Sequence, residues 1–443
     1  MSLSLEQWLH HQAGVHPQTI DLGLDRISLV LKELGWRQPG VPVITVAGTN
    51  GKGSVSAYCA AILCAAGFRV GTFTSPHLRD YRERIRVHDR LAGADELVAA
   101  FERIEAASRE SAKSLTFFEY NAIAAFLIFE AARLDAWVLE VGMGGRLDAV
   151  NVIDASVAVV VSIGLDHQEF LGSTLDAIAR EKAGVFRPGR PAVIGSRGVP
   201  AVLVESAVAL GARPKRLGVE FDLRRGVEHW RFLGTHWDLP GLPPPALAGG
   251  TQFDNAATAL AALEELAGDL PVTAAAVKHG LQAIKLTGRF QIIEPAPGHP
   301  TWILDVAHNA DAAQVLAANL RATAAGGRTF AVCGVLGDKD APAIAEAVRD
   351  CFDGWWLAST EGARGISAAM LAQRIAGHVT APLVCTDDIA AACAAAAAAA
   401  GPLDRIVVFG SFHTVGPALD WLESRGLLPG SALPEYTGAS HRP

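Results

Sequence analysis

The sequence predicts an α/β protein with two domains, and three observations support this prediction. Apolar, β-branched stretches alternate with helical stretches along most of the chain. A glycine-rich turn that contains Lys52 follows the first of the apolar stretches and opens a helix. A length of 443 residues is more than one ordinary core organises. We expect the first domain to span 1–292 and the second 300–443, with the Pro- and Gly-rich stretch 293–301 as the linker.

The first domain begins with strand, loop, helix and strand, the usual start of a parallel sheet. Its polar and aromatic alternation between 190 and 245 predicts antiparallel strands instead. We therefore expect a P-loop, doubly wound, mostly parallel sheet domain with a small antiparallel region. The predicted strands are 41–46, 69–74, 136–141 and 156–163, and the predicted helices are 55–66, 121–133, a helix from 174 that closes at 181–184, and 255–266.

The second domain repeats the alternation on a smaller scale and predicts a smaller, Rossmann-like α/β C-terminal domain. Its uncharged alanine tract, 390–400, is best interpreted as a soluble helix because alanine has the highest helix propensity. The predicted strands are 302–306, 329–335, 354–358 and 405–409.

Composition excludes several classes of protein. With 38 Lys and Arg against 46 Asp and Glu, the formal charge is -8, which argues against a general nucleic-acid binder. No apolar run reaches the roughly 18 residues of a membrane-spanning helix. Residues 1–25 lack Lys, Arg and a continuous apolar core, so they do not form a secretory signal. Six cysteines without a C-x-x-C pair are interpreted as buried, reduced thiols. We expect a cytoplasmic protein that binds neither nucleic acid nor membrane.

The turn Gly48–Ser54 is typical of a phosphate-binding loop. Its glycines let backbone N–H groups approach phosphate oxygens, and Lys52 stands at the start of the following helix. The loop departs from G-x-x-x-x-G-K-[ST], because Val46 replaces the first glycine and Gly53 precedes Ser54. This departure disfavours a generic GTPase or kinase. The alternatives are an ordinary tight turn and, in another functional class, a P-loop switch or binding module.

Polar residues follow several predicted strands, where the carboxyl ends of a parallel sheet form the ligand crevice. Glu140 ends an apolar strand beside the phosphate loop, which suggests Mg²⁺ coordination. His167 follows another strand and is a second ligand candidate, with a loop role equally open. Ser75 could be a hydroxyl ligand or a turn residue. From its position alone, Lys182 is a helix-end lysine favoured by the helix dipole, with Gly184 as the cap.

Three residues of the second domain are further candidates. Asp305 and His308 follow a predicted strand and could engage a nucleotide or reacting groups, or cap the next helix. Arg289 precedes the expected linker and could reach phosphate, although a solvated surface arginine is the simpler interpretation.

Taken together, these motifs resemble the bifunctional dihydrofolate synthase/folylpolyglutamate synthase family of the Mur ligase superfamily. The likeness runs over nearly the whole chain, in the order and spacing of the family. Two departures, Met143 for the usual Leu and Ala310 for the usual Pro, remove no functional group. The matching segments are Gly48–Ser54, Ser75–Leu78, Glu140–Asp148, Asp166–His167, Glu181–Gly184, Asp305–Asn309, Gly337–Asp340 and Gly410–Val415.

The resemblance implies a role for each matching position. Lys182 matches a lysine that is carbamylated in the family, and Asp305 and His308 are expected to orient reactants and handle protons. The implied Mg²⁺ ligands, for two ions, are Ser75, Glu140 and His167. The implied ATP contacts are Asn50, Gly51, Lys52, Gly53, Ser54, Asn255, Arg289 and Asp305. The implied dihydropteroate contacts are Thr19, Ile20, Asp21, Leu22, Thr116, Phe117, Phe118, Glu119, Leu147, Asp148 and Ala149.

The activity implied is ATP-dependent ligation of L-glutamate to dihydropteroate and to tetrahydrofolate through an acyl phosphate. Presence of all three dihydropteroate segments favours the bifunctional reading over a monofunctional folylpolyglutamate synthase. A cell-wall Mur ligase would need a UDP-binding domain before the loop, and only 47 residues precede Gly48. An inactive scaffold is disfavoured because every matched catalytic position is present. The resemblance also implies a monomer.

Overall fold

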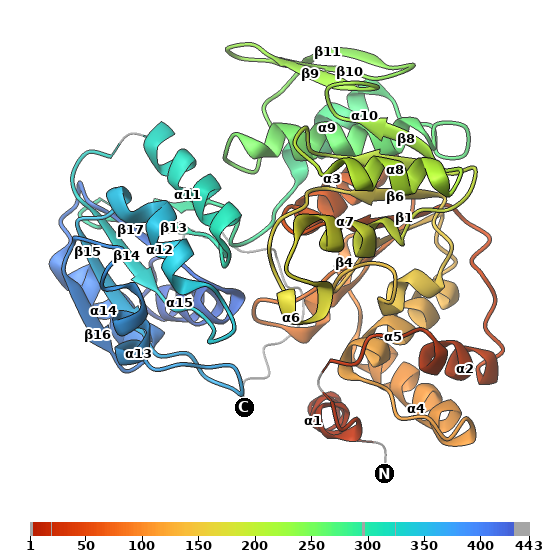
Figure 1. Ribbon diagram of the computed structural model, residues 1–443, viewed down its shortest axis with the longest axis horizontal. Coiled ribbons are helices and arrows are strands. Elements are labelled where there is room, and N and C mark those ends of the chain that lie inside the picture. The colour runs from red at the N-terminus through yellow and green to blue at the C-terminus, as the bar shows by residue number, and fades with distance from the viewer. Residues whose placement is uncertain (1–2, 19, 295–296, 324, 429–443) are drawn as a thin grey trace. The chain divides into compact units, whose positions relative to one another are not determined.

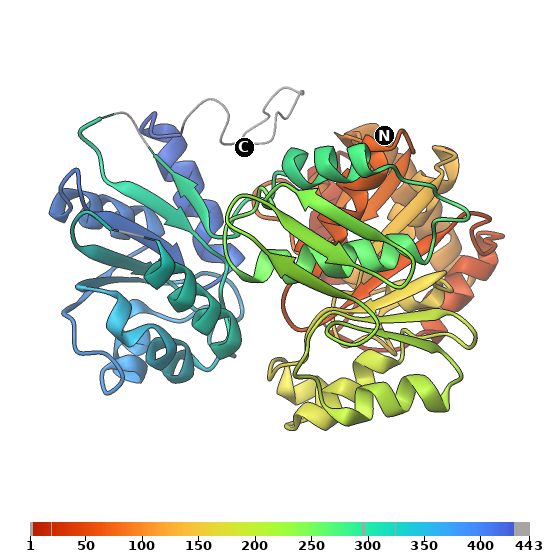
Figure 2. The same ribbon diagram turned by 90° about the horizontal axis from the view of Figure 1, so that it is seen from above.

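The computed structural model describes residues 3–18, 20–294, 297–323 and 325–428. The chain divides into two compact units, each with its own sheet and core (Figures 1 and 2). The first contains Met1–Ala246 and Gln252–Ile284, and the second contains Leu247–Thr251 and Lys285–Pro443. The first unit therefore ends at Ile284, before the expected domain end at residue 292.

The first unit is built on an eight-stranded sheet in the order β4-β3-β2-β5-β1-β6-β7-β8. The strands from β2 to β8 in this order are parallel, and β3 and β4 add an antiparallel edge. The four predicted strands are confirmed, with ends that differ by at most three residues. The strands are β1 Val43–Ala47, β2 Val70–Phe73, β3 Ile85–Val87, β4 Arg90–Leu91, β5 Ala136–Glu140, β6 Val157–Val160, β7 Pro191–Ile194 and β8 Arg213–Arg216.

Helices cover both faces of this sheet, which is the doubly wound arrangement (Figure 1). On one face α3 packs against α10, and on the other α4 packs against α5. The helices are α1 Leu5–Val15, α2 Asp25–Glu33, α3 Lys52–Ala65, α4 Ala94–Glu110, α5 Phe117–Ala131, α6 Gln168–Leu171, α7 Leu175–Ala183, α8 Ala201–Ala209, α9 Thr251–Glu264 and α10 Ala274–Ala283, with short 3₁₀ turns η1 Tyr81–Arg84 and η2 Ala149–Val152.

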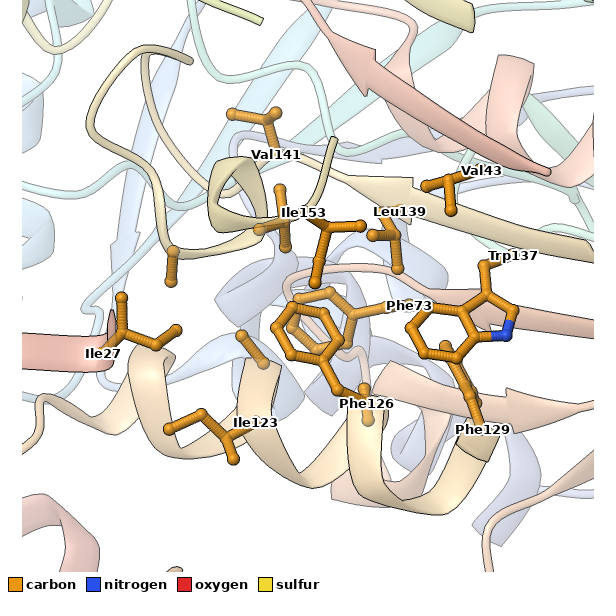
Figure 3. Close-up of a cluster of buried hydrophobic side chains, with 14 of the residues drawn as sticks. Ile27, Val43, Phe73, Ile123, Phe126, Phe129, Trp137, Leu139, Val141 and Ile153 are labelled. Carbon is orange, nitrogen blue, oxygen red and sulfur yellow. The ribbon is translucent and has the colours of Figure 1, made fainter. Parts of the chain in front are cut away.

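An aromatic core fixes α5 against the sheet (Figure 3). The ring of Phe126 on α5 stacks at 6.2 Å on Trp137 of β5, and Phe129 meets the same indole edge-on at 5.4 Å. The helix is apolar nearly all round because it is buried between the sheet and α4. Its first turn closes with a capping box between Thr116 and Glu119. Since α5 leads into β5, this capped end lies at the carboxyl edge of the sheet.

The antiparallel strands predicted between 190 and 245 are confirmed only in the second half of that region. They form a three-stranded sheet of β9 Asp222–Arg225, β10 Trp230–Leu233 and β11 Asp238–Leu242. The first half instead supplies the parallel strands β7 and β8, together with α8. The run Pro191–Ile194 is fully buried and continuously apolar, which suits a parallel strand covered on both faces.

The second unit has a six-stranded sheet in the order β12-β13-β17-β14-β15-β16. Only the edge pair β12–β13 is antiparallel. The four predicted strands and the predicted alanine-rich helix, α14, are confirmed. The elements are β12 Gln291–Ile293, β13 Thr301–Leu304, α11 Ala310–Ala322, β14 Thr329–Cys333, α12 Ala341–Val348, η3 Arg349–Cys351, β15 Gly354–Ala358, α13 Ala368–Ile375, β16 Leu383–Thr386, α14 Ile389–Ala399, β17 Arg405–Phe409 and α15 Phe412–Ser424.

The expected linker at 293–301 is wrong. This stretch connects β12 to β13, which pair in one sheet, so it belongs inside the second unit. Residues 295–296 lie outside the described residues. Proline and glycine interrupt regular structure in a hairpin connection as they do in a linker, so composition does not separate the two.

Two expectations from composition can be compared with the structure. Among the described residues, no helix has both the length and the apolar character needed to cross a membrane. All six cysteines are free thiols, as expected, but the expectation that they are buried is only half right. Cys385 is exposed and Cys64 and Cys351 are partly exposed, whereas Cys59, Cys333 and Cys393 are buried.

Candidate active site

The phosphate loop is fixed by the segment that leaves β6. The hydroxyl of Ser162 accepts the Asn50 N–H at 2.9 Å and donates to the Asn50 carbonyl at 2.9 Å. The hydroxyl of Thr49 donates to the carbonyl of Gly164 at 3.1 Å and accepts its N–H at 2.9 Å. These paired bonds set the path of the loop before α3 begins. The sequence analysis missed Ser162 and Gly164, because a serine or glycine after a strand has no distinctive pattern.

Gly51 and Ser54 have the properties expected of a loop that holds phosphate. Gly51 has φ 84°, a backbone conformation that favours glycine. A Cβ there would lie 2.8 Å from Val161 and 2.9 Å from the side-chain oxygen of Asn255, so the predicted nucleotide contact Asn255 lies directly against the loop. The hydroxyl of Ser54 is buried without a hydrogen-bond partner among the described residues. A buried polar atom of this kind fits a site that a ligand completes.

Two lysines converge on one carbonyl oxygen of the loop. The Lys52 ammonium donates to the Gly48 carbonyl at 3.0 Å and to Thr49 at 3.2 Å. Lys182 on α7, 4% exposed, donates to the same Gly48 oxygen at 3.0 Å. Burial, and then the charge of Lys52, lowers the pKa of Lys182 to about 7. Lys182 is therefore not a solvated helix-end lysine, although Gly184 does cap α7 as predicted.

The predicted metal ligands lie at the carboxyl edge of the first sheet. Glu140 is the last residue of β5, is 4% exposed, and accepts the Ser75 N–H at 3.3 Å. His167 precedes α6 with φ 50°, an uncommon conformation for histidine that is held where the surrounding structure determines it. No group of three His, Cys, Asp or Glu side chains suited to a metal occurs in the described chain. The carboxylate and the hydroxyl are oxygen ligands of the kind that Mg²⁺ prefers, and Mg²⁺ commonly completes its shell with phosphate oxygens and water. The imidazole is a less usual ligand for this ion.

The three predicted dihydropteroate segments are far apart in sequence but lie together in the first unit. The Gly23 N–H donates to the Leu147 carbonyl at 3.2 Å. Arg26 joins the first and second segments, with Nη1 2.7 Å from Asp21 and Nη2 3.3 Å from Glu119. Ile20 and Leu22 belong to the first of these segments and Ala149 to the third, whereas Thr19 lies outside the described residues.

Phe118 and Asp148 give this region its chemical character. The ring of Phe118 lies over Gly142, where a Cβ would be only 2.5 Å from the ring. Asp148 is 3% exposed and accepts the N–H groups of Met143 and Val150 at 2.8 and 3.1 Å. Burial raises the pKa of Asp148 to about 7, so its carboxyl can donate as well as accept near neutral pH.

The remaining predicted residues lie in the second unit. Asp305 follows β13 and accepts the N–H groups of Phe290 and Ala307 at 2.9 and 2.8 Å, and burial raises its pKa. The guanidinium of Arg289 lies 5.2 Å from the ring centre of Phe412, so it is not merely a solvated surface group.

The helix α11 is capped at its N-terminus by Asn309. Neither Asp305 nor His308, the two candidates for proton handling, caps this helix. His308 Nδ1 lies 2.8 Å from the Val306 carbonyl. Because a carbonyl only accepts, Nδ1 carries the proton, and in the neutral imidazole Nε2 carries the lone pair.

The sheets, the phosphate loop and the lysine beside it define an ATP-using ligase of the Mur type. Residues 46–195 match the model of the Mur ligase middle domain, and residues 288–412 match that of the Mur ligase glutamate ligase domain. The dihydrofolate synthase/folylpolyglutamate synthase of Escherichia coli (strain K12) is 41% identical over 421 residues, which cover 95% of this chain and 96% of the relative. The chain belongs to the dihydrofolate synthase/folylpolyglutamate synthase family.

Solved structures agree with this assignment. That of E. coli FolC in complex with DHPP and ADP has a TM-score of 0.90 at 41% identity, covering 96% of this chain and 99% of that one. A bifunctional folylpolyglutamate synthase/dihydrofolate synthase with Mn, AMPPNP and L-glutamate bound has a TM-score of 0.86 at 40% identity, covering 95% of this chain and 98% of that one. The resemblance and the fold class predicted from the sequence are both confirmed.

Proposed function

We propose that this enzyme ligates L-glutamate to dihydropteroate, forming dihydrofolate, and to tetrahydrofolate, forming folylpolyglutamate. ATP is the co-substrate, and ADP and phosphate are the other products. The observation that carries the proposal is the assembly of the three predicted pteroate segments, linked through Gly23–Leu147 and Arg26–Glu119.

The reaction proceeds in two balanced steps. A carboxylate oxygen of the pteroyl or folyl substrate attacks the γ-phosphorus of ATP, forming an acyl phosphate and releasing ADP. The amine of L-glutamate then attacks the acyl carbon, loses a proton, and phosphate leaves. Backbone N–H groups of Asn50–Ser54 and the Lys52 ammonium bind the triphosphate and stabilise its charge.

Ser75, Glu140 and His167 are the proposed ligands for Mg²⁺, which when bound neutralises charge on the phosphates. We propose two ions, and Mn in a relative is consistent with a divalent metal. The buried Glu140 carboxylate and the φ of His167 support these assignments. Glu140 also supports Ser75, because its carboxylate accepts the Ser75 N–H.

Lys182 is the proposed site of carbamylation. Its pKa of about 7 leaves much of the amine neutral at neutral pH, and only the neutral amine attacks CO₂. The new N–C bond forms with loss of an N–H proton to solvent, and the product carries a negative charge. The carbamate would supply an oxygen ligand and position metal; it would not act as a nucleophile.

The proposed contacts in the second unit are with nucleotide and glutamate. Arg289 and Asp305, with Asn255 of the first unit, are proposed to contact ATP. His308 and Asp305 are proposed to orient the glutamate amine and accept its proton. The lone pair on His308 Nε2 and the raised pKa of Asp305 support a role in proton handling.

We further propose that the enzyme works in the cytoplasm as a monomer without nucleic-acid or membrane partners. Six free thiols and a net charge of -8 support this environment and the absence of a nucleic-acid partner. Light scattering coupled to gel filtration tests the monomer.

The deciding experiment measures ADP release with L-glutamate plus either dihydropteroate or tetrahydrofolate. Turnover with both substrates is expected. Turnover with tetrahydrofolate alone would identify a monofunctional folylpolyglutamate synthase, and turnover with neither would reject the proposal. A parallel reaction without glutamate separates a ligase from a P-loop switch NTPase. The NTPase would release ADP as fast without glutamate as with it, whereas a ligase would not.

A further inference from the structure

Arg84 is a buried cation that has no acidic partner among the described residues. It ends η1 directly before β3, and its carbonyl accepts the Thr74 N–H at 2.9 Å, which places it at the edge where β2 ends. Its side chain is 8% exposed. In the part of the chain that the structure describes, Arg84 forms no ion pair. Buried charges are normally paired, because an unpaired one is costly to remove from water.

The guanidinium is nevertheless held in a defined place. Its Nε donates to Nδ1 of His77 at 2.8 Å. Its central carbon lies 5.4 Å from the ring centre of Phe117 and 6.0 Å from that of Tyr81. No described residue accepts a hydrogen bond from either Nη atom. The two outer nitrogens, which form the face that pairs with a carboxylate, therefore remain to be satisfied.

The neighbouring carboxylates, Glu83 and Glu140, both accept backbone N–H groups. Glu83 accepts the N–H groups of Leu78, Arg79 and Asp80 at 2.7 to 3.0 Å. Glu140 accepts the Ser75 N–H. Burial lowers the pKa of Arg84, while Tyr81, Glu140 and Glu83 act electrostatically in the opposite direction. Arginine stays charged at neutral pH even with a lowered pKa, so a cation persists here.

We propose that Arg84 binds the carboxylate of the pteroyl or folyl substrate, the group that becomes phosphorylated. The inference rests on the proposed function and adds a residue to it. The guanidinium touches Phe117 of the predicted pteroate region and feels the charge of Glu140 of the predicted metal site. A carboxylate bound to Nη1 and Nη2 would therefore lie close to both the predicted pteroate region and the predicted metal site.

The test is a double-mutant cycle between the arginine and the substrate carboxylate. Binding of dihydropteroate and of its carboxamide analogue is measured by calorimetry without ATP, for the wild type and for Arg84→Gln. Wild type should prefer the carboxylate by about 10- to 100-fold, the range of a bidentate charged pair. Arg84→Gln should discriminate by less than about threefold on the same scale. A second arm with tetrahydrofolate shows whether a folyl carboxylate uses the same group.

Controls distinguish substrate binding from a purely structural role, in which Arg84 only holds His77 in place through their hydrogen bond. Arg84→Lys keeps the charge but loses the paired donors, and should retain only part of the preference. Arg86 lies two residues further on, in β3, and its guanidinium donates to the Asp89 carbonyl at 3.1 Å, so Arg86→Gln should bind like wild type. If the role is purely structural, Arg84→Gln should raise KM for ATP as much as KM for dihydropteroate. It should also keep the wild-type preference for the carboxylate over the carboxamide.

Discrimination that survives in Arg84→Gln would overturn the inference, as would equal binding of acid and carboxamide by wild type. Equal binding of acid and carboxamide is measured on the wild type alone, so the inference can be refuted even if Arg84→Gln does not fold. Failure of the proposed function is a different result, in which the wild type turns over neither dihydropteroate nor tetrahydrofolate.

Discussion

Replacing Lys182 by methionine should stabilise the protein at neutral pH while abolishing ligation. The amine is buried and donates to the Gly48 oxygen that also accepts from Lys52. Burial and the Lys52 charge lower the pKa of Lys182 from 10.5 to about 7. Methionine has a similar length, fills the space, and carries no charge to remove from water.

The sign and size of the effect follow from proton binding. Between pH 7 and 10.5 the unfolded chain holds a proton on Lys182 that the folded chain does not, so wild-type stability rises with pH across this window. Each pH unit is worth about 1.4 kcal/mol, so the full penalty, present below pH 7, is about 5 kcal/mol. The lost hydrogen bond to Gly48 offsets about 1 kcal/mol of the gain. The advantage of Lys182→Met should therefore be about 4 kcal/mol at pH 6.5 and shrink by about 2 kcal/mol between pH 7 and 9.

Urea unfolding in CO₂-free buffer at several pH values measures this difference. Lys32→Met is the matched control, because Lys32 is exposed on α2 and should show no such trend. Bicarbonate should narrow the gap, since a carbamate replaces the buried ammonium, and should not restore activity to Lys182→Met. A stability difference that stays constant from pH 7 to 9 would refute the reasoning, and full activity of the variant would refute the metal-positioning role.

Three further substitutions test the rest of the first-unit site. Gly51→Ala should lower stability by about 2–5 kcal/mol, from positive φ and collision with Asn255, and raise KM for ATP at least tenfold; urea unfolding and steady-state kinetics check this, and an unchanged KM would contradict it. Glu140→Gln should weaken Mn²⁺ binding in an electron-spin-resonance titration, and equal affinity would remove Glu140 from the metal site. Gly142→Ala should displace the Phe118 ring and raise KM for dihydropteroate about tenfold while changing KM for ATP less than twofold; the reverse pattern would argue against a pterin role.

The parts of the fold that could be predicted are those with strong local signals. β1, β5 and β14 are continuous, buried, β-branched or apolar runs, and each was predicted within two residues. Two of the missed strands lack that signal. β12 has three residues at a sheet edge, and β16 is partly exposed, so neither produces a long apolar run or a clear alternation.

The site divides in the same way. The phosphate loop and Glu140 could be found because glycines, a lysine and a strand-end carboxylate leave a pattern in the chain. Ser162 could not, because its role depends on β6 lying beside β1, which is a property of the sheet order. Arg84 could not either, since one arginine among several in its segment is distinguished only by burial and by what fails to pair with it.

The shared carbonyl of Gly48 links the two unusual features of the loop. An ammonium from Lys52 and one from Lys182 on a single oxygen repel each other, and this repulsion adds to burial in lowering the pKa of Lys182. Carbamylation would convert one of these positive groups into a negative one. Lys52 would then be left as the cation for the triphosphate, while the carbamate would favour a divalent metal nearby. On the proposed function, CO₂ and Mg–ATP should therefore bind with positive cooperativity, because the carbamate would attract the metal and the bound metal would neutralise the carbamate.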